Sequence, residues 1–85
     1  MSRATITPIQ FSLIKQLLSG YSIRRNRSKY SLIAPNGSFA RTIQVMSLKG
    51  LIRRGFMDES FELAAGLRTK NRTIIHNGKT FVVVG

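Results

Sequence analysis

The sequence predicts a small α+β domain with two main helices, intervening β-hairpins and a C-terminal β-hairpin. Apolar residues recur at helical spacing in two segments, residues 9–21 and 45–52. The other apolar runs are short, rich in β-branched side chains and bounded by turn residues, which is typical of strands. A chain of 85 residues is the size of one domain with one small core, so we expect a single domain over residues 1–85.

A first helix is expected to begin at Pro8. Thr7 and Gln10 form a capping-box pattern, and proline suits the first helical position because no N–H is needed there. The apolar residues that follow share one face: Phe11, Ile14, Leu17, Leu18 and Tyr21. Gly20 can take the left-handed conformation that ends a helix. We therefore expect a core-forming helix, preceded by a flexible segment at residues 1–6.

Residues 21–29 are dense in positive charge. The cations are Arg24, Arg25, Arg27 and Lys29. We expect a loop or a frayed second helix, which is either a solvated basic loop or a phosphate clamp made of arginine forks. No carboxylate precedes residue 58, so no acid is near in the sequence to pair with these cations, and this favours the clamp.

A β-hairpin is expected next, and it leads into the second helix. Residues 30–34 have strand composition, Pro35, Asn36 and Gly37 favour a turn, and residues 38–41 can return antiparallel.

The second helix, expected over residues 42–57, is apolar on one side and cationic on the other. The apolar side contains Val45, Leu48, Leu51 and Ile52, and the opposite side contains Met46, Ser47, Lys49, Gly50, Arg53 and Arg54. Thr42 is the expected N-cap, and Gly55 the expected left-handed residue after the last turn. A solvent-facing glycine inside a helix costs about 1 kcal/mol relative to alanine. Either another backbone, such as that of a nucleic acid, approaches Gly50 closely, or this residue reflects drift.

Residues 58–67 are compatible with two structures. Phe61 and Leu63 alternate with polar neighbours, which favours a second hairpin, whereas Asp58 could N-cap a helix that runs to about Leu67. Residues 66–72 are expected to form a basic loop.

A C-terminal hairpin is expected over residues 73–84. Asn77 and Gly78 separate two β-branched runs, and both tolerate the positive φ of a type I′ turn. The last run is apolar on both faces, so it should be a covered strand and not a bare edge. His76, beside the turn, is expected to be a plain strand or surface residue.

The composition excludes several classes of function. The chain has no cysteine and one histidine, so neither a thiolate site nor a metal site is expected. The three carboxylates, Asp58, Glu59 and Glu62, lie together without a partner for acid–base chemistry, so we expect no catalytic residues and no cofactor. The N-terminus has no apolar signal region, and no run is long enough to span a bilayer, which predicts a soluble, cytoplasmic protein without membrane contact.

The charge indicates a polyanionic partner. Fourteen lysines and arginines against three acids give a net charge of +11. Such a chain repels itself unless a polyanion neutralises it, and nucleic acid is the commonest large polyanion in a cytoplasm. A merely basic soluble domain is the plainer alternative, but its acids would be interspersed among the cations.

The order of elements resembles the small winged-helix DNA-binding proteins of phages and bacterial mobile elements. In that family a strand with an Asn-Gly turn precedes a helix that closes on Arg-Arg-Gly and apolar residues, followed by a wing. The matching segments are residues 30–37, then Leu51, Ile52, Arg53, Arg54, Gly55, Phe56 and Met57, then residues 61–63 as the returning wing strand. The resemblance covers about residues 7–65, as a helix/hairpin/helix/wing core. Two features depart from it: residues 21–29 show no clear second helix, and the C-terminal hairpin is additional.

The resemblance implies a non-enzymatic transcriptional regulator that binds duplex DNA, with the helix at residues 42–55 in the major groove. Ser47, Lys49 and Arg53 would lie nearest the base edges. Phosphates would be held by Arg24, Arg25, Arg27 and Lys29 on one side and by Arg68, Lys70 and Arg72 on the other, and Arg41 and Arg54 complete the expected contact set. A homodimer through Met46 or the last strand is expected, because one short helix reads few bases. The setting is a bacterial or phage-infected cell.

Two other classes of function remain open. An RNA-binding protein would fit the charge, and exposure of Tyr30 or Phe39 as a stacking surface would favour it. A phage-encoded inhibitor, docking on an acidic or nucleic-acid-binding host protein, would use the same charge complementarity. Salt-sensitive binding to DNA would separate the regulator from such an inhibitor.

Overall fold

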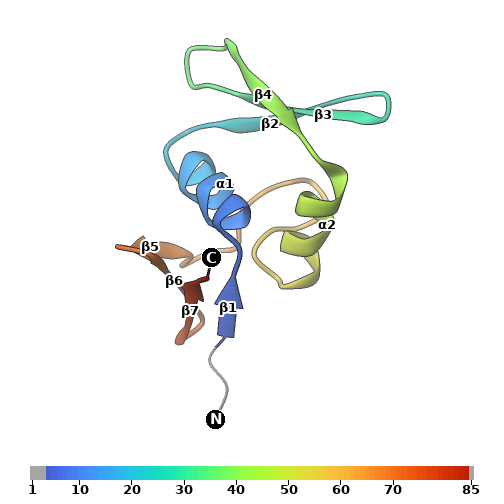
Figure 1. Cartoon of the computed structure of the whole chain (residues 1–85). Coiled ribbons are helices and arrows are strands. Elements are labelled where there is room, and N and C mark those ends of the chain that lie inside the picture. The colour runs from blue at the N-terminus through green and yellow to red at the C-terminus, as the bar shows by residue number, and fades with distance from the viewer. Residues whose placement is uncertain (1–3, 85) are drawn as a thin grey trace.

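The computed structural model describes residues 4–84, with two helices and seven strands within them. In chain order these are β1 (Ala4–Ile6), α1 (Pro8–Leu18), β2 (Ser22–Asn26), β3 (Lys29–Ile33), β4 (Phe39–Ile43), α2 (Val45–Arg53), β5 (Arg68–Lys70), β6 (Thr73–His76) and β7 (Lys79–Val83). One sheet has the order β2-β3-β4 and the other β1-β7-β6-β5. α1 lies between the two sheets, with α2 beside it under the three-stranded sheet (Figure 1). The predicted α+β class is confirmed.

α1 begins where the capping box predicts. The Thr7 hydroxyl accepts a hydrogen bond from the Gln10 backbone N–H, and the Gln10 side chain accepts one from the Thr7 backbone N–H. The prediction of a flexible segment at residues 1–6 is wrong for residues 4–6, which form β1. Ile6 is buried in the core, and β1 pairs in parallel with β7, so burial and a strand ladder together order this segment. Residues 1–3 lie outside the described part of the chain.

The basic segment at residues 21–29 is mostly strand, so the predicted loop or frayed helix is wrong. β2 pairs with β3 along its whole length, from Ser22 opposite Ile33 to Asn26 opposite Lys29. Ile23 packs against the core, which places the alternate residues of β2 on the other face. The connecting turn contains Arg27 at a φ of +57°. A turn made without glycine or asparagine carries no sequence signal, which explains the missed hairpin.

The hairpin predicted at residues 30–41 is confirmed, but the second helix begins later than predicted. Thr42 pairs with Ser31 in the ladder of β3 and β4, so it is a strand residue and not an N-cap. Ile43 is buried, which extends β4 by the alternation of a half-buried strand. Gln44 is the N-cap and makes no capping hydrogen bond through its side chain. At the other end, Gly55 takes the predicted left-handed conformation, with a φ of +83°.

Gly50 faces α1 and not open solvent. A Cβ atom at this position would lie 2.7 Å from the Gln10 side-chain nitrogen, Nε2. The close neighbour is therefore another helix of the same chain, and the expectation of a solvent-facing glycine beside a nucleic-acid backbone is wrong.

Residues 58–67 form an irregular loop. Met57 and Leu63 make one isolated antiparallel bridge, so the predicted second hairpin is reduced to that pair and the alternative helix does not form. The Asp58 carboxylate accepts hydrogen bonds from the backbone N–H groups of Ser60 and Glu62, at 2.8 and 3.1 Å, which closes a turn instead of capping a helix. Neither this bridge nor the three-stranded sheet, whose strands follow α1 and precede α2 in the chain, confirms a winged-helix arrangement.

The C-terminal hairpin is confirmed. Asn77 and Gly78 both have positive φ, at +51° and +74°, and β7 lies covered between β1 and β6. Residues 66–72, predicted as a loop, contain β5, because Thr69 pairs with Ile74 on the free edge of β6.

One core joins both sheets and both helices. Its fully buried members include Ile6, Leu13, Ile14, Leu32, Leu48, Leu51, Phe56 and Ile74. Residues from both sheets and both helices therefore share one hydrophobic core.

Candidate nucleic-acid interface

An open groove lies between the β2–β3 hairpin and α2, and we call it the α2 groove. Its volume is about 510 Å³. Three cations line it, Arg25, Lys49 and Arg53, and its apolar lining comes from Tyr30, Val45, Leu48, Ile52 and Phe61. The groove thus combines a cationic rim with an apolar floor.

The strand register brings Arg25 into the α2 groove. Arg25 lies directly opposite Tyr30 on the neighbouring strand, so both side chains are on the face of the sheet that looks toward α2. The Arg25 guanidinium carbon lies 6.0 Å from the centre of the Tyr30 ring, at the outer limit of a cation–π contact. Its Nε donates a hydrogen bond to the Arg27 backbone oxygen at 3.3 Å.

The helical period brings the other two cations into the same groove. Lys49 and Arg53 are four residues apart on α2, so they lie on one side of the helix, and both are exposed. Leu48 and Leu51 are fully buried and anchor the helix against the core. This anchoring sets the orientation of the exposed cations relative to the hairpin.

Two aromatic residues that the sequence did not predict to meet, Tyr30 and Phe61, lie together at the α2 groove. The Tyr30 and Phe61 rings meet edge to face, with their centres 5.3 Å apart. Phe61 has a φ of +64°, a left-handed conformation that is strained for a bulky side chain. From the sequence, Tyr30 was considered only as a stacking residue for RNA and Phe61 only as a strand residue, and no pattern predicted that the two rings meet.

The structure does not bring together the three residues that were predicted to contact base edges, Ser47, Lys49 and Arg53. Ser47 lies with Ile9 and Gln44 around a separate hollow between the two helices and β4. It is partly buried there, on a different side of α2 from Lys49 and Arg53.

Two other predicted contact residues are engaged within the chain. Arg41 donates a hydrogen bond from Nη2 to the Gln16 side-chain oxygen at 2.9 Å, which ties β4 to α1. Arg54 donates a hydrogen bond to the Thr5 backbone oxygen, which ties the end of α2 to β1. Neither residue lines the α2 groove.

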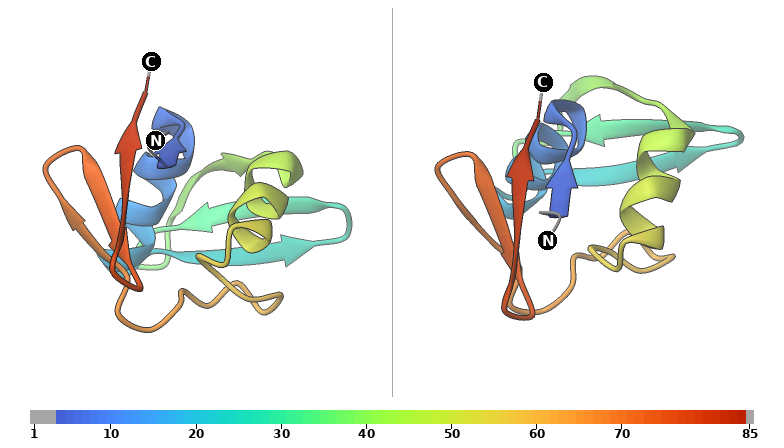
Figure 2. Two further views of the ribbon diagram at one scale, coloured as in Figure 1. Left: turned by 90° about the horizontal axis from the view of Figure 1, so that it is seen from below. Right: turned by 60° about the horizontal axis from the view of Figure 1, so that its bottom comes forward.

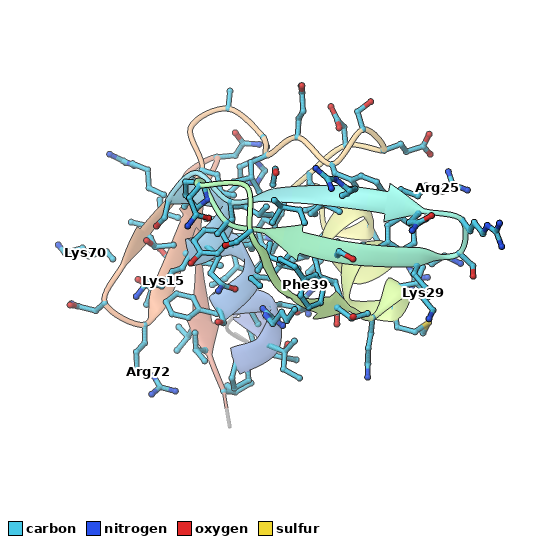
Figure 3. The ribbon with its side chains drawn as sticks, turned by 90° about the horizontal axis from the view of Figure 1, so that it is seen from above. Lys15, Arg25, Lys29, Phe39, Lys70 and Arg72 are labelled. Atoms are coloured by element: carbon cyan, nitrogen blue, oxygen red, sulfur yellow. The ribbon has the colours of Figure 1, made fainter. Side chains whose placement is uncertain are left out.

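The remaining predicted cations fall into two groups at opposite ends of the molecule. Arg27 is at the tip of the β2–β3 hairpin, and the pairing of strands places Arg24 and Lys29 on its outer face. Lys70 and Arg72, on the β5–β6 hairpin, lie at the end of the molecule far from this tip, at the left of Figure 3, while Arg25 and Lys29 lie at the right. Arg68 belongs to the same far hairpin, so these three cations do not join the α2 groove.

The acids do little to neutralise this surface. All three carboxylates of the chain are on the loop after α2, and one of them, Glu59, lines the α2 groove. Asp58 is held by the backbone of its own turn. Outside this loop the sequence has no carboxylate to offset its lysines and arginines. The resulting net charge of +11 favours binding of an anion with many charges.

Other chemistry finds no support in residues 4–84. In that range no cluster of three metal-ligating side chains occurs. None of its helices has both the length and the apolarity required to cross a membrane. Comparisons with protein-family models, with curated proteins and with solved structures returned no match to this chain.

Proposed function

We propose that this protein is a non-enzymatic binder of duplex DNA that acts in the cytoplasm as a small transcriptional regulator. The observation that supports the proposal most is the convergence of Arg25, from β2, with Lys49 and Arg53, from α2, on one open groove. Cations supplied by two elements at fixed spacing suit a ligand with regularly repeated phosphates better than they suit a single small anion.

The exposed side of α2 would lie in the major groove. That groove is about 12 Å wide and admits an α-helix, which measures about 10–12 Å across with its side chains, and the nine residues of α2 extend about 13 Å along its axis. Lys49 and Arg53 would be nearest the base edges, because lysine and arginine contacts to guanine are the commonest specific ones. Ser47 lies at the hollow between the two helices and β4, so it is not among the residues proposed to contact base edges.

The β2–β3 hairpin would serve as the wing. It reaches past α2 in both views of Figure 2, so it can follow the DNA backbone while α2 occupies the groove. Arg25 and Arg27 would hold phosphates there and set the register without reading sequence.

A homodimer would extend the contact, because one helix of this length reads few bases. β7 has a neighbour on each edge, so the last strand offers no free edge for a partner. Met46, on α2 and 74% exposed, is the better candidate for the dimer contact.

The proposal is tested by fluorescence anisotropy with duplex DNA, single-stranded DNA and structured RNA over a salt series. If about six phosphates are engaged, duplex affinity should fall about a thousandfold between 50 and 200 mM salt. A preference for duplex that persists at 200 mM salt supports the regulator and justifies selection of its site.

A matched pair of variants locates the contact. Arg25→Ala/Lys49→Ala/Arg53→Ala should weaken duplex binding strongly, whereas Arg68→Ala/Lys70→Ala/Arg72→Ala removes the same charge at the far hairpin and should weaken it little. Equal losses would mean that charge alone attracts the DNA. Absence of binding to every nucleic acid would reject the proposal in favour of an acidic protein partner.

A further inference from the structure

The outer face of the three-stranded sheet is open. In Figure 1 both helices lie on the other side of this sheet, and Figure 3 views the sheet from above with no helix or second sheet over it. Leu32, Ile43 and Ile23 point inward and belong to the core or pack against it. Strand alternation and register place on the outer face one buried apolar side chain, Ile33, and otherwise mainly polar ones: Ser22, Arg24, Asn26, Lys29, Ser31 and Thr42.

One aromatic residue borders this polar face. Phe39 begins β4 opposite Ile33, and 62% of it is exposed. It belongs neither to the core cluster nor to the apolar residues that pack against it. A phenyl ring left in water at the edge of a cationic surface is suited to stack against a nucleic-acid base, since every base offers a flat face.

Cations lie in the middle and at the hairpin end of the same face. Arg24 lies directly across from Ser31, and Lys29 is paired with Asn26 at the hairpin end. From Ile33, beside Phe39, to Lys29 the strand extends about 13 Å. A short single strand could therefore place one base on the Phe39 ring and its neighbouring phosphates on Arg24 and Lys29.

The β2–β3 hairpin carries cations on both of its faces. Arg25 points into the α2 groove, whereas Arg24 points outward, and Arg27 occupies the tip between them. Two separate backbones can thus be neutralised at once, one on each side of the hairpin.

We propose that the outer face of the β2-β3-β4 sheet binds single-stranded DNA, with a base stacked on Phe39 and phosphates held by Arg24 and Lys29. An exposed Phe39 also fits RNA, and DNA is the chosen occupant because the face adjoins the proposed duplex site on α2. The hairpin then stands between a duplex on the α2 side and an unpaired strand on the outer side, so the preferred ligand is forked DNA. The fork preference rests on the proposed function, because it needs duplex binding by α2. Binding of the unpaired strand does not depend on it.

The first test is spectroscopic and uses the absence of tryptophan from the chain. Phe39→Trp introduces a single indole, and oligothymidine should quench its emission because the indole stacks on a base. Ile9→Trp is the matched control, since Ile9 is 61% exposed but lies on α1. Quenching that is equal at both positions would overturn the assignment of the face.

The second test compares affinities. Phe39→Ala should weaken binding of single-stranded DNA about tenfold and leave binding of a blunt duplex of equal length unchanged. Lys49→Ala/Arg53→Ala should weaken binding of the blunt duplex and leave binding of single-stranded DNA unchanged. A forked substrate should bind more tightly than the blunt duplex to the natural protein, and Phe39→Ala should remove that advantage. Because Phe39 is exposed, an unchanged thermal midpoint verifies that the variant is folded.

The outcomes separate the two proposals. Single-stranded binding that does not change in Phe39→Ala overturns the inference. So does RNA of the same sequence that binds ten times more tightly than the DNA, because the occupant would then be RNA. If blunt duplex fails to bind while Phe39-dependent binding of single-stranded DNA remains, the face is confirmed, whereas the duplex regulator and the fork preference both fail.

Discussion

The β2–β3 and β5–β6 hairpins are alike in sequence chemistry and differ in surroundings. Both are short, both carry several cations, and both turn through a residue other than glycine in the left-handed region, Arg27 at a φ of +57° and Asn71 at +54°. Only the β2–β3 hairpin lies beside α2, where Arg25 meets Lys49 and Arg53. The comparison teaches that positive charge marks both hairpins, and that proximity to a second cationic element distinguishes one of them as a site.

The two turns differ in how well the residue suits the backbone. Asparagine tolerates the left-handed conformation, whereas arginine loses about 1 kcal/mol or more there. The strained turn is thus the one beside the candidate site. Departures from local preference are concentrated at functional sites in proteins, so this strain agrees with the choice of the β2–β3 hairpin.

The largest expected effects are on stability, and they test whether the two hairpins belong to one cooperative unit. Leu32 and Ile74, one in each sheet, are both fully buried. Leu32→Ala and Ile74→Ala should each lower the free energy of unfolding by about 2–5 kcal/mol, through lost burial and a residual cavity. Urea unfolding measures this by two probes, far-UV circular dichroism and tyrosine fluorescence.

The tyrosine signal makes that comparison decisive. Both tyrosines, Tyr21 and Tyr30, lie in or next to the three-stranded sheet. Ile74→Ala, in the other sheet, should therefore shift both probes equally if one core joins the sheets. A shift in circular dichroism alone would show that the hairpins unfold independently.

The next effect concerns charge at the two ends. The triple alanine variant of Arg25, Lys49 and Arg53 should lower duplex affinity about 10- to 100-fold and reduce the log–log salt slope by about 0.9, because Arg25 is the one of the three that is placed on a phosphate. The triple variant of Arg68, Lys70 and Arg72 should leave the slope nearly unchanged. Anisotropy titrations at four salt concentrations measure both slopes, and equal slopes would remove the distinction between the hairpins.

A smaller effect sharpens the comparison of the turns. Arg27→Gly relieves the left-handed strain and should raise stability by up to about 1 kcal/mol, while it weakens duplex binding several-fold through the lost cation. Asn71→Gly should change stability less and leave binding unaltered. Thermal unfolding and anisotropy together measure the pair. A stability gain that is larger for Asn71→Gly would contradict this account of the turns.

The smallest effect concerns α2, the element that distinguishes the two hairpins. Gly50→Ala adds about 1 kcal/mol of helix propensity but forces the Gln10 side chain to move, since the new Cβ would lie 2.7 Å from its Nε2. We expect a net change within about 0.5 kcal/mol in thermal unfolding. In a Gln10→Ala background the same change should stabilise by nearly the full propensity gain. Absence of such coupling would show that α1 does not restrict α2 at Gly50.

Local chemistry made several elements predictable from sequence. The capping box of Thr7 and Gln10 specified the start of α1, and Asn77 with Gly78 specified the C-terminal turn, because each signal acts within four residues. The apolar spacing of Leu48 and Leu51 likewise predicted the buried side of α2. The charge of +11 and the clustering of the acids are properties of the chain itself.

The tertiary structure decided the rest, because it depends on pairing between residues far apart in the chain. β2 forms against β3 through a turn whose central residues are neither glycine nor asparagine, β5 lacks the apolar run typical of a strand and forms by pairing with β6, and β1 pairs with β7 across most of the sequence. The same pairing separates the predicted contact residues. It gathers Arg25, Lys49 and Arg53 at one groove, engages Arg41 and Arg54 in hydrogen bonds to other residues of the chain, and leaves Phe39 at the edge of an open sheet face. Periodicity within one element can identify a cationic side, but only the packing of elements shows which cationic sides meet.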